Sequence, residues 1–324
     1  MTTEPTIILS GTDSDLPQQI PQGLARYTGF REMARGGSGL LRSCMDTVTG
    51  RMVAVKTLLP EVTHDRSERR RFLREARVTA QLQHPNTVPV YDIGDDKEQG
   101  VYFVMKRISG ENFFEILKRV AQGDESTLAA YPISRRLEIL ADACQALAYA
   151  HARGVIHRDM KPENIWVGNF GEVYLLDWGV AKVWGHADDN IPLRDIAIEQ
   201  SKRGRLDGQL QTLTGGGQRP GTPLYMSPEQ VQGNRGIDER TDIFSVGVCL
   251  YEMLALSEPF RGAHINETFD NIQNKQPDSP STRSPHLGIP KRADAVVMRA
   301  IDKAPSFRFQ SMRDMIAAIR DIEC

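Results

Sequence analysis

The chain has 324 residues, of which 40% are hydrophobic and 25% are charged, and its net charge is −2. A chain of this length can bury one large core or two smaller ones. The near-neutral charge and the dispersed basic residues argue against a nucleic-acid-binding protein.

The four cysteines are scattered and form no C-x-x-C pair, which is typical of reduced thiols in a cytoplasmic protein. No apolar run approaches the ~20 residues that cross a bilayer. Residues 1–26 lack a basic start and a continuous apolar stretch, so we expect a flexible polar leader and no signal peptide. The chain ends abruptly after a helical pattern, so it could be a fragment of a longer protein.

Residues 27–106 alternate short apolar runs with turn signals, and this pattern predicts a small β-rich domain. The stretches RMVAVKTLL and VYFVM have the composition of strands. The segment SERRRFLREARVTAQLQ between them has apolar residues at helical spacing. We therefore expect a sheet with one helix.

From residue 107 to the end the pattern becomes helical, which predicts a larger second domain. In SRRLEILADACQALAYAHARG the apolar and small residues at 137, 140, 141, 144, 147 and 148, together with the histidine at 151, fall on one helix face. Residues 242–256 are apolar on nearly every side, which is typical of a helix buried in the middle of a domain. Residues 184–221 and 274–290 look irregular. The predicted fold class is α+β, with two lobes joined near residues 106–110.

The motif HRDMKPENIW places Asp159, Lys161 and Asn164 within six residues, ahead of two apolar runs around the turn GNFGE. If these runs pair as a hairpin, its centre lies near residue 170.5, and Asn164 stands beside Asp177 at the open end. Mg²⁺ binds through a few protein oxygens plus substrate phosphates. The sequence therefore predicts a Mg²⁺ site beside Asp159.

A glycine-rich turn, ARGGSGLL, precedes the apolar strand VAVK. Such a turn lets backbone N–H groups approach phosphates closely, although glycine-rich turns alone are common. Lys56 stands on that strand, where a charge is costly unless it is paired. Glu75, on the following helix, is an available partner.

Taken together, these motifs resemble those of the eukaryotic-type Ser/Thr protein kinases, and in particular the bacterial branch. The marks are the Gly-rich loop, VAVK, the helix Glu75, HRDMKPEN, DWG in place of DFG, and SPE in place of APE. The resemblance implies the two-lobed kinase fold, with an N-lobe at residues 27–106, a C-lobe at 107–324 and an activation segment at 177–229. It implies an enzyme that transfers the γ-phosphate of ATP to Ser and Thr hydroxyls of proteins.

The resemblance also implies catalytic roles. Lys56 would hold the α- and β-phosphates of ATP and pair with Glu75. Asp159 would accept the proton of the substrate hydroxyl, and Lys161 would steady the γ-phosphate. Metal binding falls to Asn164 and Asp177, with Mg²⁺ as the ion and Mn²⁺ as an alternative.

Around the nucleotide, adenine is expected between Ala54 and Trp166, with Met105 as gatekeeper and the backbone of Lys106 and Ile108 as hinge donors and acceptors. Glu111 is placed for ribose or for a basic substrate residue. The phosphate-binding turn comprises Met33, Ala34, Arg35, Gly36, Gly37, Ser38, Gly39, Leu40 and Leu41.

Regulatory and structural roles follow from the same resemblance. Arg158 is typical of control by activation-loop phosphorylation, in which a new phosphate pairs with the arginine. Thr212 and Thr214 match the region where bacterial relatives autophosphorylate, so self-association is a possible requirement. Thr222 together with Lys161 indicates Ser/Thr acceptors. Structural support is expected from a Glu229–Arg308 ion pair and from Asp242, which would brace the catalytic loop.

Ala34, Trp178 and the long segment after Asp177 depart from the family pattern. They leave open a pseudokinase, a nucleotide-binding scaffold without transfer activity. We interpret Trp178 as a tolerated variant of a working site, because Asp177 itself is intact. A small-molecule phosphotransferase is disfavoured by GTPLYMSPE and Arg308. The insert at residues 184–210 has no role that the sequence indicates.

Overall fold

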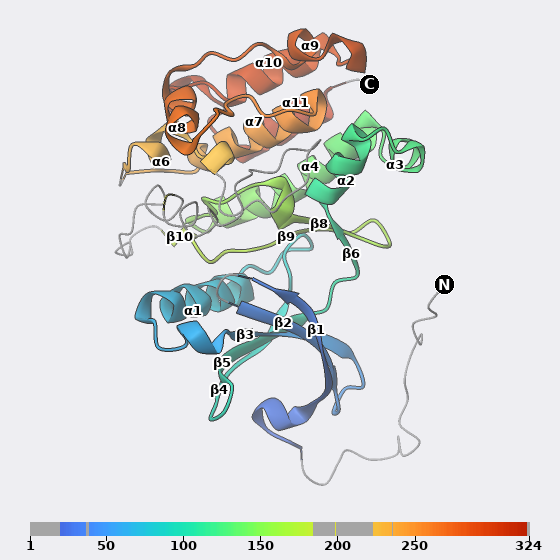
Figure 1. The fold of residues 1–324 in the computed structure, drawn as a ribbon, viewed down its shortest axis with the longest axis vertical. Helices are drawn as coiled ribbons and strands as arrows, with labels where there is room; N and C mark the ends of the chain where they lie inside the picture. The colour runs from blue at the N-terminus through green and yellow to red at the C-terminus, as the bar shows by residue number, and fades with distance from the viewer. Residues whose placement is uncertain (1–19, 37–38, 184–197, 199–222, 235, 323–324) are drawn as a thin grey trace. The chain divides into compact units, whose positions relative to one another are not determined.

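The computed structural model describes residues 20–36, 39–183, 198, 223–234 and 236–322. The chain forms two compact units, one of residues 1–83 and 88–109 and the other of residues 84–87 and 110–324. Figure 1 shows the strands β1–β5 with the helix α1 in the first unit and a set of helices in the second.

The first unit is built on an antiparallel five-stranded sheet in the order β1-β2-β3-β5-β4. Its α-helix begins after Asp65, whose side chain accepts from the backbone N–H groups of Ser67 and Glu68 and so caps the first turn. The elements are η1 (Gly23–Arg26), β1 (Tyr27–Arg35), β2 (Gly39–Asp46), β3 (Met52–Leu58), η2 (Pro60–Val62), α1 (Arg66–Gln81), β4 (Val90–Asp96) and β5 (Gly100–Lys106).

A buried cluster lies on each face of this sheet, since alternate side chains of a strand point to opposite sides. On one face Val53 and Val55 pack in a cluster with Leu24 of η1. On the other face Phe103 of β5 packs with Phe72 of α1, at 5.1 Å between ring centroids. The two clusters hold β3 between a helix and a 3₁₀ turn.

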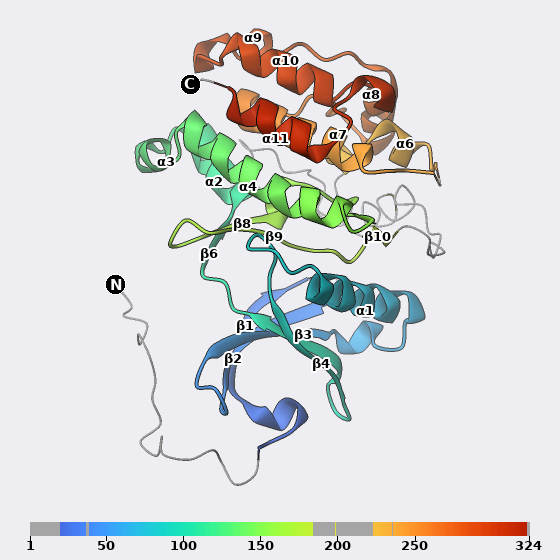
Figure 2. The ribbon, with the colours of Figure 1, turned by 180° about the vertical axis from the view of Figure 1, so that it is seen from behind.

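The second unit is mainly helical and is built around α7 (Arg240–Ala255), in which every residue from Thr241 onward is buried. Figure 2 shows α4 and α11 alongside α7. The other elements are β6 (Gly110–Asn112), α2 (Phe113–Ala121), α3 (Glu125–Ala130), α4 (Ile133–His151), β7 (Val155–Ile156), η3 (Pro162–Asn164), β8 (Ile165–Gly168), β9 (Val173–Leu175), β10 (Lys182–Val183), η5 (Pro223–Tyr225), α6 (Pro228–Val231), α8 (Ile265–Asn274), α9 (Pro280–Arg283), η6 (Pro285–Leu287), α10 (Lys291–Ala300), η7 (Pro305–Phe307) and α11 (Met312–Arg320).

A sheet unit with one α-helix and a larger, mainly helical unit confirm the predicted α+β fold class. The expectation of an irregular segment at residues 274–290 was wrong in part, because α9 and η6 lie within it. Each begins with a proline, which suits the first turn of a helix. In the part of the chain that the structure describes, no helix is both long enough and apolar enough to cross a membrane.

Candidate active site

Lys56 lies on β3, opposite Leu41 of β2 and Phe103 of β5. Its Nζ is 2.5 Å and 2.7 Å from the two carboxylate oxygens of Glu75, on α1. The Lys56 side chain is 26% exposed and that of Glu75 is 14% exposed. The structure thus joins these residues in an ion pair at the edge of solvent, where the ammonium group can also reach a ligand.

The glycine-rich turn connects β1 and β2, and its described glycines explain why the turn can be so tight. Gly36 N–H donates to the Gly39 carbonyl over 2.9 Å. A Cβ added at Gly39 would lie 3.3 Å from Cε of Lys56 and 3.4 Å from the Thr57 carbonyl oxygen. Glycine at this position therefore keeps the turn close to Lys56. Gly37 and Ser38 lie outside the described residues.

The remaining residues assigned to the phosphate-binding turn lie on the strands that flank it. Met33, Ala34 and Arg35 end β1, and Leu40 and Leu41 begin β2. The register opposes Ala34 to Leu41 and Arg35 to Leu40.

The residues expected around adenine fall on both units. Ala54 pairs with Met105 across β3 and β5, and the Lys106 N–H donates to the Pro89 carbonyl over 2.9 Å. Ile108 follows in the segment between β5 and β6. Trp166 lies on β8, and its Nε1–H is buried without a partner among the described residues.

Glu111 on β6 is held by a contact that sequence reasoning missed. Its carboxylate accepts two hydrogen bonds from the Arg119 guanidinium, at 2.6 Å and 2.7 Å. Arg119 on α2 also donates to Thr127 on α3. A ribose or a basic substrate residue would compete with this bidentate pair, so Glu111 is less available than the resemblance implied.

The catalytic-loop residues converge on one carboxylate. Asp159 Oδ2 accepts from Lys161 Nζ over 2.6 Å and from Asn164 Nδ2 over 3.3 Å. Asn164 Nδ2 also donates to the Asp159 carbonyl over 2.8 Å. Both side-chain contacts fall on Oδ2, and the Asp159 side chain is 36% exposed. The other oxygen, Oδ1, accepts no hydrogen bond from the described residues.

The hairpin that follows has a different register from the predicted one. β8 and β9 pair Ile165 with Leu175 and Val167 with Val173, so the hairpin centre is residue 170 and not 170.5. Beyond the last pair, the Leu176 N–H donates to the Asn164 carbonyl over 2.8 Å. Asn164 therefore stands opposite Leu176, and the expectation that it faces Asp177 was wrong by one residue.

Asp177 follows this pair with an exposed side chain and a left-handed backbone, at φ 63°. Its Oδ1 accepts from the Gly179 N–H over 3.3 Å. Burial would lower the pKa of Lys161, but the carboxylates of Asp159 and Asp177 outweigh this effect and hold that pKa above its ordinary value. Asp177 therefore lies within electrostatic reach of the catalytic loop.

These donors fit a divalent cation. Asp177 offers an exposed carboxylate, and the amide oxygen of Asn164 remains for a ligand because the amide nitrogen is used by Asp159. Among the described residues no three His, Cys, Asp or Glu side chains form a metal-binding group. A cation here would need further oxygens from water or phosphate, which is the coordination that Mg²⁺ favours.

Trp178, which stands in DWG where the family has the phenylalanine of DFG, is fully buried. Its ring meets the His157 ring edge-on, at 4.5 Å between centroids and 64° between planes. The indole Nε1–H is buried without a partner in the described part of the chain. Trp178 is thus a packing residue with one unsatisfied donor, and it leaves the Asp177 carboxylate exposed.

Asp242 of α7 holds the backbone of the catalytic loop. Its Oδ2 accepts from the His157 N–H over 2.9 Å, and its Oδ1 accepts from the Arg158 N–H over 2.8 Å. His151 Nε2 contacts the same carboxylate over 2.7 Å, a partner that sequence reasoning missed. Burial would raise the pKa of Asp242, but these contacts and the charge of the imidazoles lower it below its ordinary value.

Arg158 also has a left-handed backbone, at φ 68°. Its Nε donates to the Val180 carbonyl over 2.6 Å, so it links the catalytic loop to the segment after Asp177. The Arg158 carbonyl accepts from Gln230 Nε2 over 2.9 Å. These contacts explain how a non-glycine residue is kept in this conformation.

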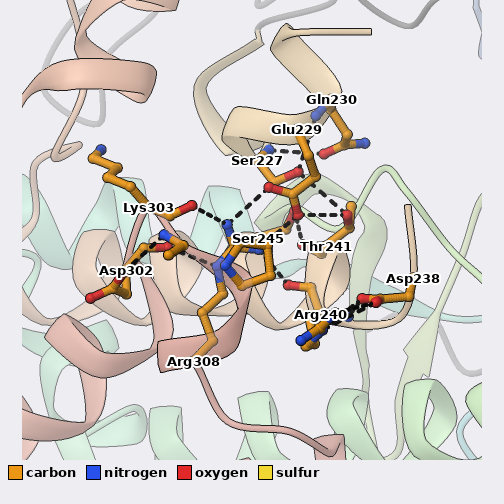
Figure 3. Close-up of polar contacts among 12 residues, drawn as sticks. Ser227, Glu229, Gln230, Asp238, Arg240, Thr241, Ser245, Asp302, Lys303 and Arg308 are labelled. Carbon is orange, nitrogen blue, oxygen red and sulfur yellow. Dashed lines mark hydrogen bonds and ion pairs between the residues drawn. The ribbon is translucent and has the colours of Figure 1, made fainter. Parts of the chain in front are cut away.

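Arg308 and Glu229 form an ion pair in the larger unit that is reinforced by several hydrogen bonds (Figure 3). The guanidinium is fully buried, and it donates to the two Glu229 oxygens over 2.7 Å and 2.9 Å. It also donates to the carbonyls of Asp302, Lys303 and Arg240. Burial would raise the pKa of Glu229, but the hydrogen bonds and charge of Arg308 lower it below its ordinary value.

Three predicted positions cannot be placed. Thr212, Thr214 and Thr222 lie outside the described residues.

Comparison with known proteins identifies the family. The model of the protein kinase domain matches residues 27–316. A serine/threonine-protein kinase PknD of Chlamydia caviae is 36% identical over 303 residues, which cover 91% of this chain and 31% of the relative. Its counterpart in Chlamydia pneumoniae is 35% identical, over 90% of this chain and 30% of the relative. The PknD of Protochlamydia amoebophila is 31% identical, over 92% of this chain and 29% of the relative.

This chain spans about a third of the length of the curated relatives it matches. The similarity nevertheless covers nine-tenths of the chain itself, and the family model spans the glycine-rich turn and the HRDMKPEN motif. The chain therefore belongs to the protein kinase family, and its likeness to bacterial Ser/Thr kinases confirms the kinase domain that the motifs predict.

Proposed function

We propose that this chain is an active Ser/Thr protein kinase that transfers the γ-phosphate of ATP to protein hydroxyls in the presence of Mg²⁺. The observation that carries the proposal is the Asp159 carboxylate. Its Oδ2 is fixed by Lys161 and Asn164, while Oδ1 is left to accept the proton of a substrate hydroxyl. A base must lie within hydrogen-bond reach of the proton it accepts, and a fixed, half-exposed carboxylate meets that need.

Protein kinases generally use ATP and Mg²⁺, and the residues of this chain suit both. Lys56, oriented by Glu75, would bind the α- and β-phosphates, with glycine-turn N–H groups beside it. Asn164 and Asp177 would hold the metal, and Lys161 would bind the γ-phosphate. Bound Mg²⁺ supplies neutralisation of the phosphate charge, and the side chains supply in-line orientation.

The intact set of charged residues supports an enzyme rather than a pseudokinase. Nothing in the relatives favours a scaffold, since those compared are named as kinases. Trp178 fills its site while Asp177 remains exposed, so the change from DFG to DWG leaves the metal ligand unaltered.

Regulation is proposed to act through Arg158. Its Nε is bonded to the Val180 carbonyl, so the arginine is already tied to the start of the activation segment. Phosphate on Thr212 or Thr214 would add a charge-assisted contact to a guanidinium and order this segment. Autophosphorylation between two copies would supply that phosphate. Protein Ser/Thr residues are the proposed substrates, and cytoplasmic location remains a prediction.

The experiment that tests the proposal uses Asp159→Asn. The wild-type chain is incubated with Mg-ATP, and phosphorylation is followed by intact-mass spectrometry and site mapping. We expect the variant to gain no phosphate and still to be stabilised thermally by nucleotide. Asp321→Asn, at an exposed carboxylate that pairs with Arg292, is the control and should behave as wild type.

Two results would contradict the proposal. Phosphate gained equally by Asp159→Asn would exclude Asp159 as the base. No gain by the wild type, on itself or on a panel of Ser/Thr proteins, with nucleotide binding preserved, would favour the scaffold.

A further inference from the structure

A polar cavity of about 180 Å³ lies in the larger unit, away from the catalytic loop. Its wall comes from the end of α7, the segment after it, the residues that follow α8, and α9. Three basic side chains contribute to it: Arg261, Lys275 and Arg283. None of the roles proposed for this chain uses these residues.

The charges around the cavity do not balance. The three basic side chains are accompanied by two acids, Glu258 and Asp278, so the wall carries one net positive charge. Glu258 is committed, since Arg261 donates to both of its oxygens, at 3.1 Å and 2.6 Å. Lys275 and Arg283 are exposed, and neither forms a salt bridge within the described part of the chain. A ligand that carries negative charge would complete the set.

Ser257 gives the cavity a neutral donor. Its Oγ is buried and has no hydrogen-bond partner among the described residues. A buried hydroxyl without a partner is costly, and a ligand oxygen would satisfy it. In another part of the wall the Tyr251 hydroxyl donates to the Asp278 carbonyl over 2.9 Å, which links α7 to the segment after α8.

One feature opposes an anion. α7 ends at Ala255, just before the cavity, and a helix C-terminus carries roughly half a unit of negative charge. The Ser284 hydroxyl donates to the Ala255 carbonyl over 2.8 Å and so uses one of the free carbonyls. The net positive charge of the wall, with Asp278 counted, is still larger than this partial charge.

We propose that this cavity binds a phosphate group, either as the free anion or as a phosphorylated side chain of a protein. Lys275 and Arg283 would neutralise its two charges, and the Ser257 hydroxyl would donate to a phosphate oxygen. A guanidinium binds two oxygens of a phosphate or of a carboxylate at once, but the double charge of a phosphate suits two cations better than the single charge of a carboxylate does. The site lies on a different part of the unit from the proposed transfer chemistry and does not depend on it.

The test follows backbone amide shifts by NMR during titration with inorganic phosphate, and separately with a phosphothreonine peptide and its unphosphorylated form. Saturating Mg²⁺ and a non-hydrolysable ATP analogue keep the nucleotide site filled. We expect shifts at Ser257, Lys275 and Arg283, and at least tenfold weaker phosphate binding in Lys275→Ala/Arg283→Ala. Lys291→Ala/Arg313→Ala removes the same charge at exposed positions elsewhere and should leave binding unchanged.

The outcomes separate the possibilities. Tighter binding of the phosphopeptide than of phosphate identifies a phosphoprotein as the source, whereas binding of phosphate alone identifies the free anion. Equal losses in both double variants would show general charge attraction and overturn the site, as would the absence of shifts around the cavity. Ser257→Ala, which removes one hydroxyl, is expected to weaken binding by less than the double variant. Melting temperatures confirm that each variant is folded.

Discussion

This chain has two ion pairs that its motifs predicted, Lys56–Glu75 and Arg308–Glu229. Each joins a basic side chain to a glutamate, but their surroundings differ. Lys56 is 26% exposed, and the structure joins its ammonium to Glu75 at the edge of solvent. Arg308 is fully buried, and its guanidinium reaches three backbone carbonyls in addition to Glu229. The first pair can exchange a contact for a ligand. The second has its donors engaged within the protein and can only hold the fold.

This difference separates a functional pair from a structural one by physical criteria. A pair near solvent contributes little to stability, with a median of about 0–1 kcal/mol. Breaking a buried pair leaves an uncompensated charge, at a cost of about 3–5 kcal/mol. Substitution at Lys56 should therefore act on activity, and substitution at Arg308 should act on folding.

The largest effect is expected from Lys56→Met. Loss of the ammonium group that we propose to bind phosphate should lower the transfer rate by about 10³-fold, the scale of losing one preorganised electrostatic contact. The free energy of unfolding should change by only about 1 kcal/mol. Transfer assays and urea denaturation measure the two quantities, and Lys97→Met, at an exposed lysine of the same unit, is the control. A loss of stability that accounts for the lost activity would break the comparison.

Arg308→Met should destabilise the larger unit by about 3–5 kcal/mol, because Glu229 is left buried without its cation. The denaturant midpoint measures this loss, and the exposed Arg313→Met should leave the midpoint unchanged. Adding Glu229→Gln to Arg308→Met should recover part of the stability, since the unpaired charge is then removed. If the double variant is no more stable than the single one, the buried charge is not the cause.

The pH dependence of stability sharpens the same contrast. The pKa of Glu229 is held below its ordinary value of 4.5, so the unfolded chain binds this proton more readily than the folded chain. The resulting stabilisation is complete above pH 4.5 and is lost as the pH falls through the lower, folded-state pKa. The difference in unfolding free energy between wild type and Glu229→Gln, measured from pH 7 to pH 3, should become smaller in acid. A difference in unfolding free energy that stays constant with pH would contradict the lowered pKa of Glu229.

Trp178→Phe should have the smallest effect. Phenylalanine removes the buried, unpartnered Nε1–H, which is favourable, but it also leaves part of the indole volume empty, which is not. We expect these two effects on the free energy of unfolding to cancel to within about 1 kcal/mol, and we expect transfer activity to change by less than threefold. Thermal unfolding and transfer assays test this. Trp178→Ala, which opens a full cavity, should cost about 3–5 kcal/mol.

Apolar periodicity predicted the long helices, because the spacing of apolar residues repeats over several turns of each helix. The apolar face at residues 137–151 became α4, and the run at 242–256 became the buried helix α7. The catalytic loop could be predicted from the sequence for another reason. Asp159, Lys161 and Asn164 lie so close in sequence that one turn brings them together.

The hairpin after Asn164 shows where this reasoning stops. The ends of the apolar runs suggested its centre, but the turn sets the register. Gly171 has φ 86°, and its N–H donates to the Gly168 carbonyl over 3.0 Å. One residue of difference in the turn moved Asn164 from Asp177 to Leu176. Turn geometry of this kind is not encoded in apolar periodicity.

Contacts between side chains on different helices and strands were the other omission. His151 reaches Asp242 across 91 positions, and Arg119 takes both oxygens of Glu111 from the next helix. Each partner is an ordinary polar residue with many possible contacts in one sequence. Tertiary packing alone selects among them.

The left-handed backbones of Arg158 and Asp177 have a consequence for any attempt to improve this protein. A residue with a Cβ pays roughly 1–2 kcal/mol for this conformation, and glycine avoids that cost. A screen that rewards heat resistance alone would therefore drift toward glycine at both positions. Such variants would gain robustness by discarding a proposed metal ligand and a proposed phosphate sensor. Selection for robustness in this chain should be paired with selection for turnover, or it will remove the residues on which the proposed activity depends.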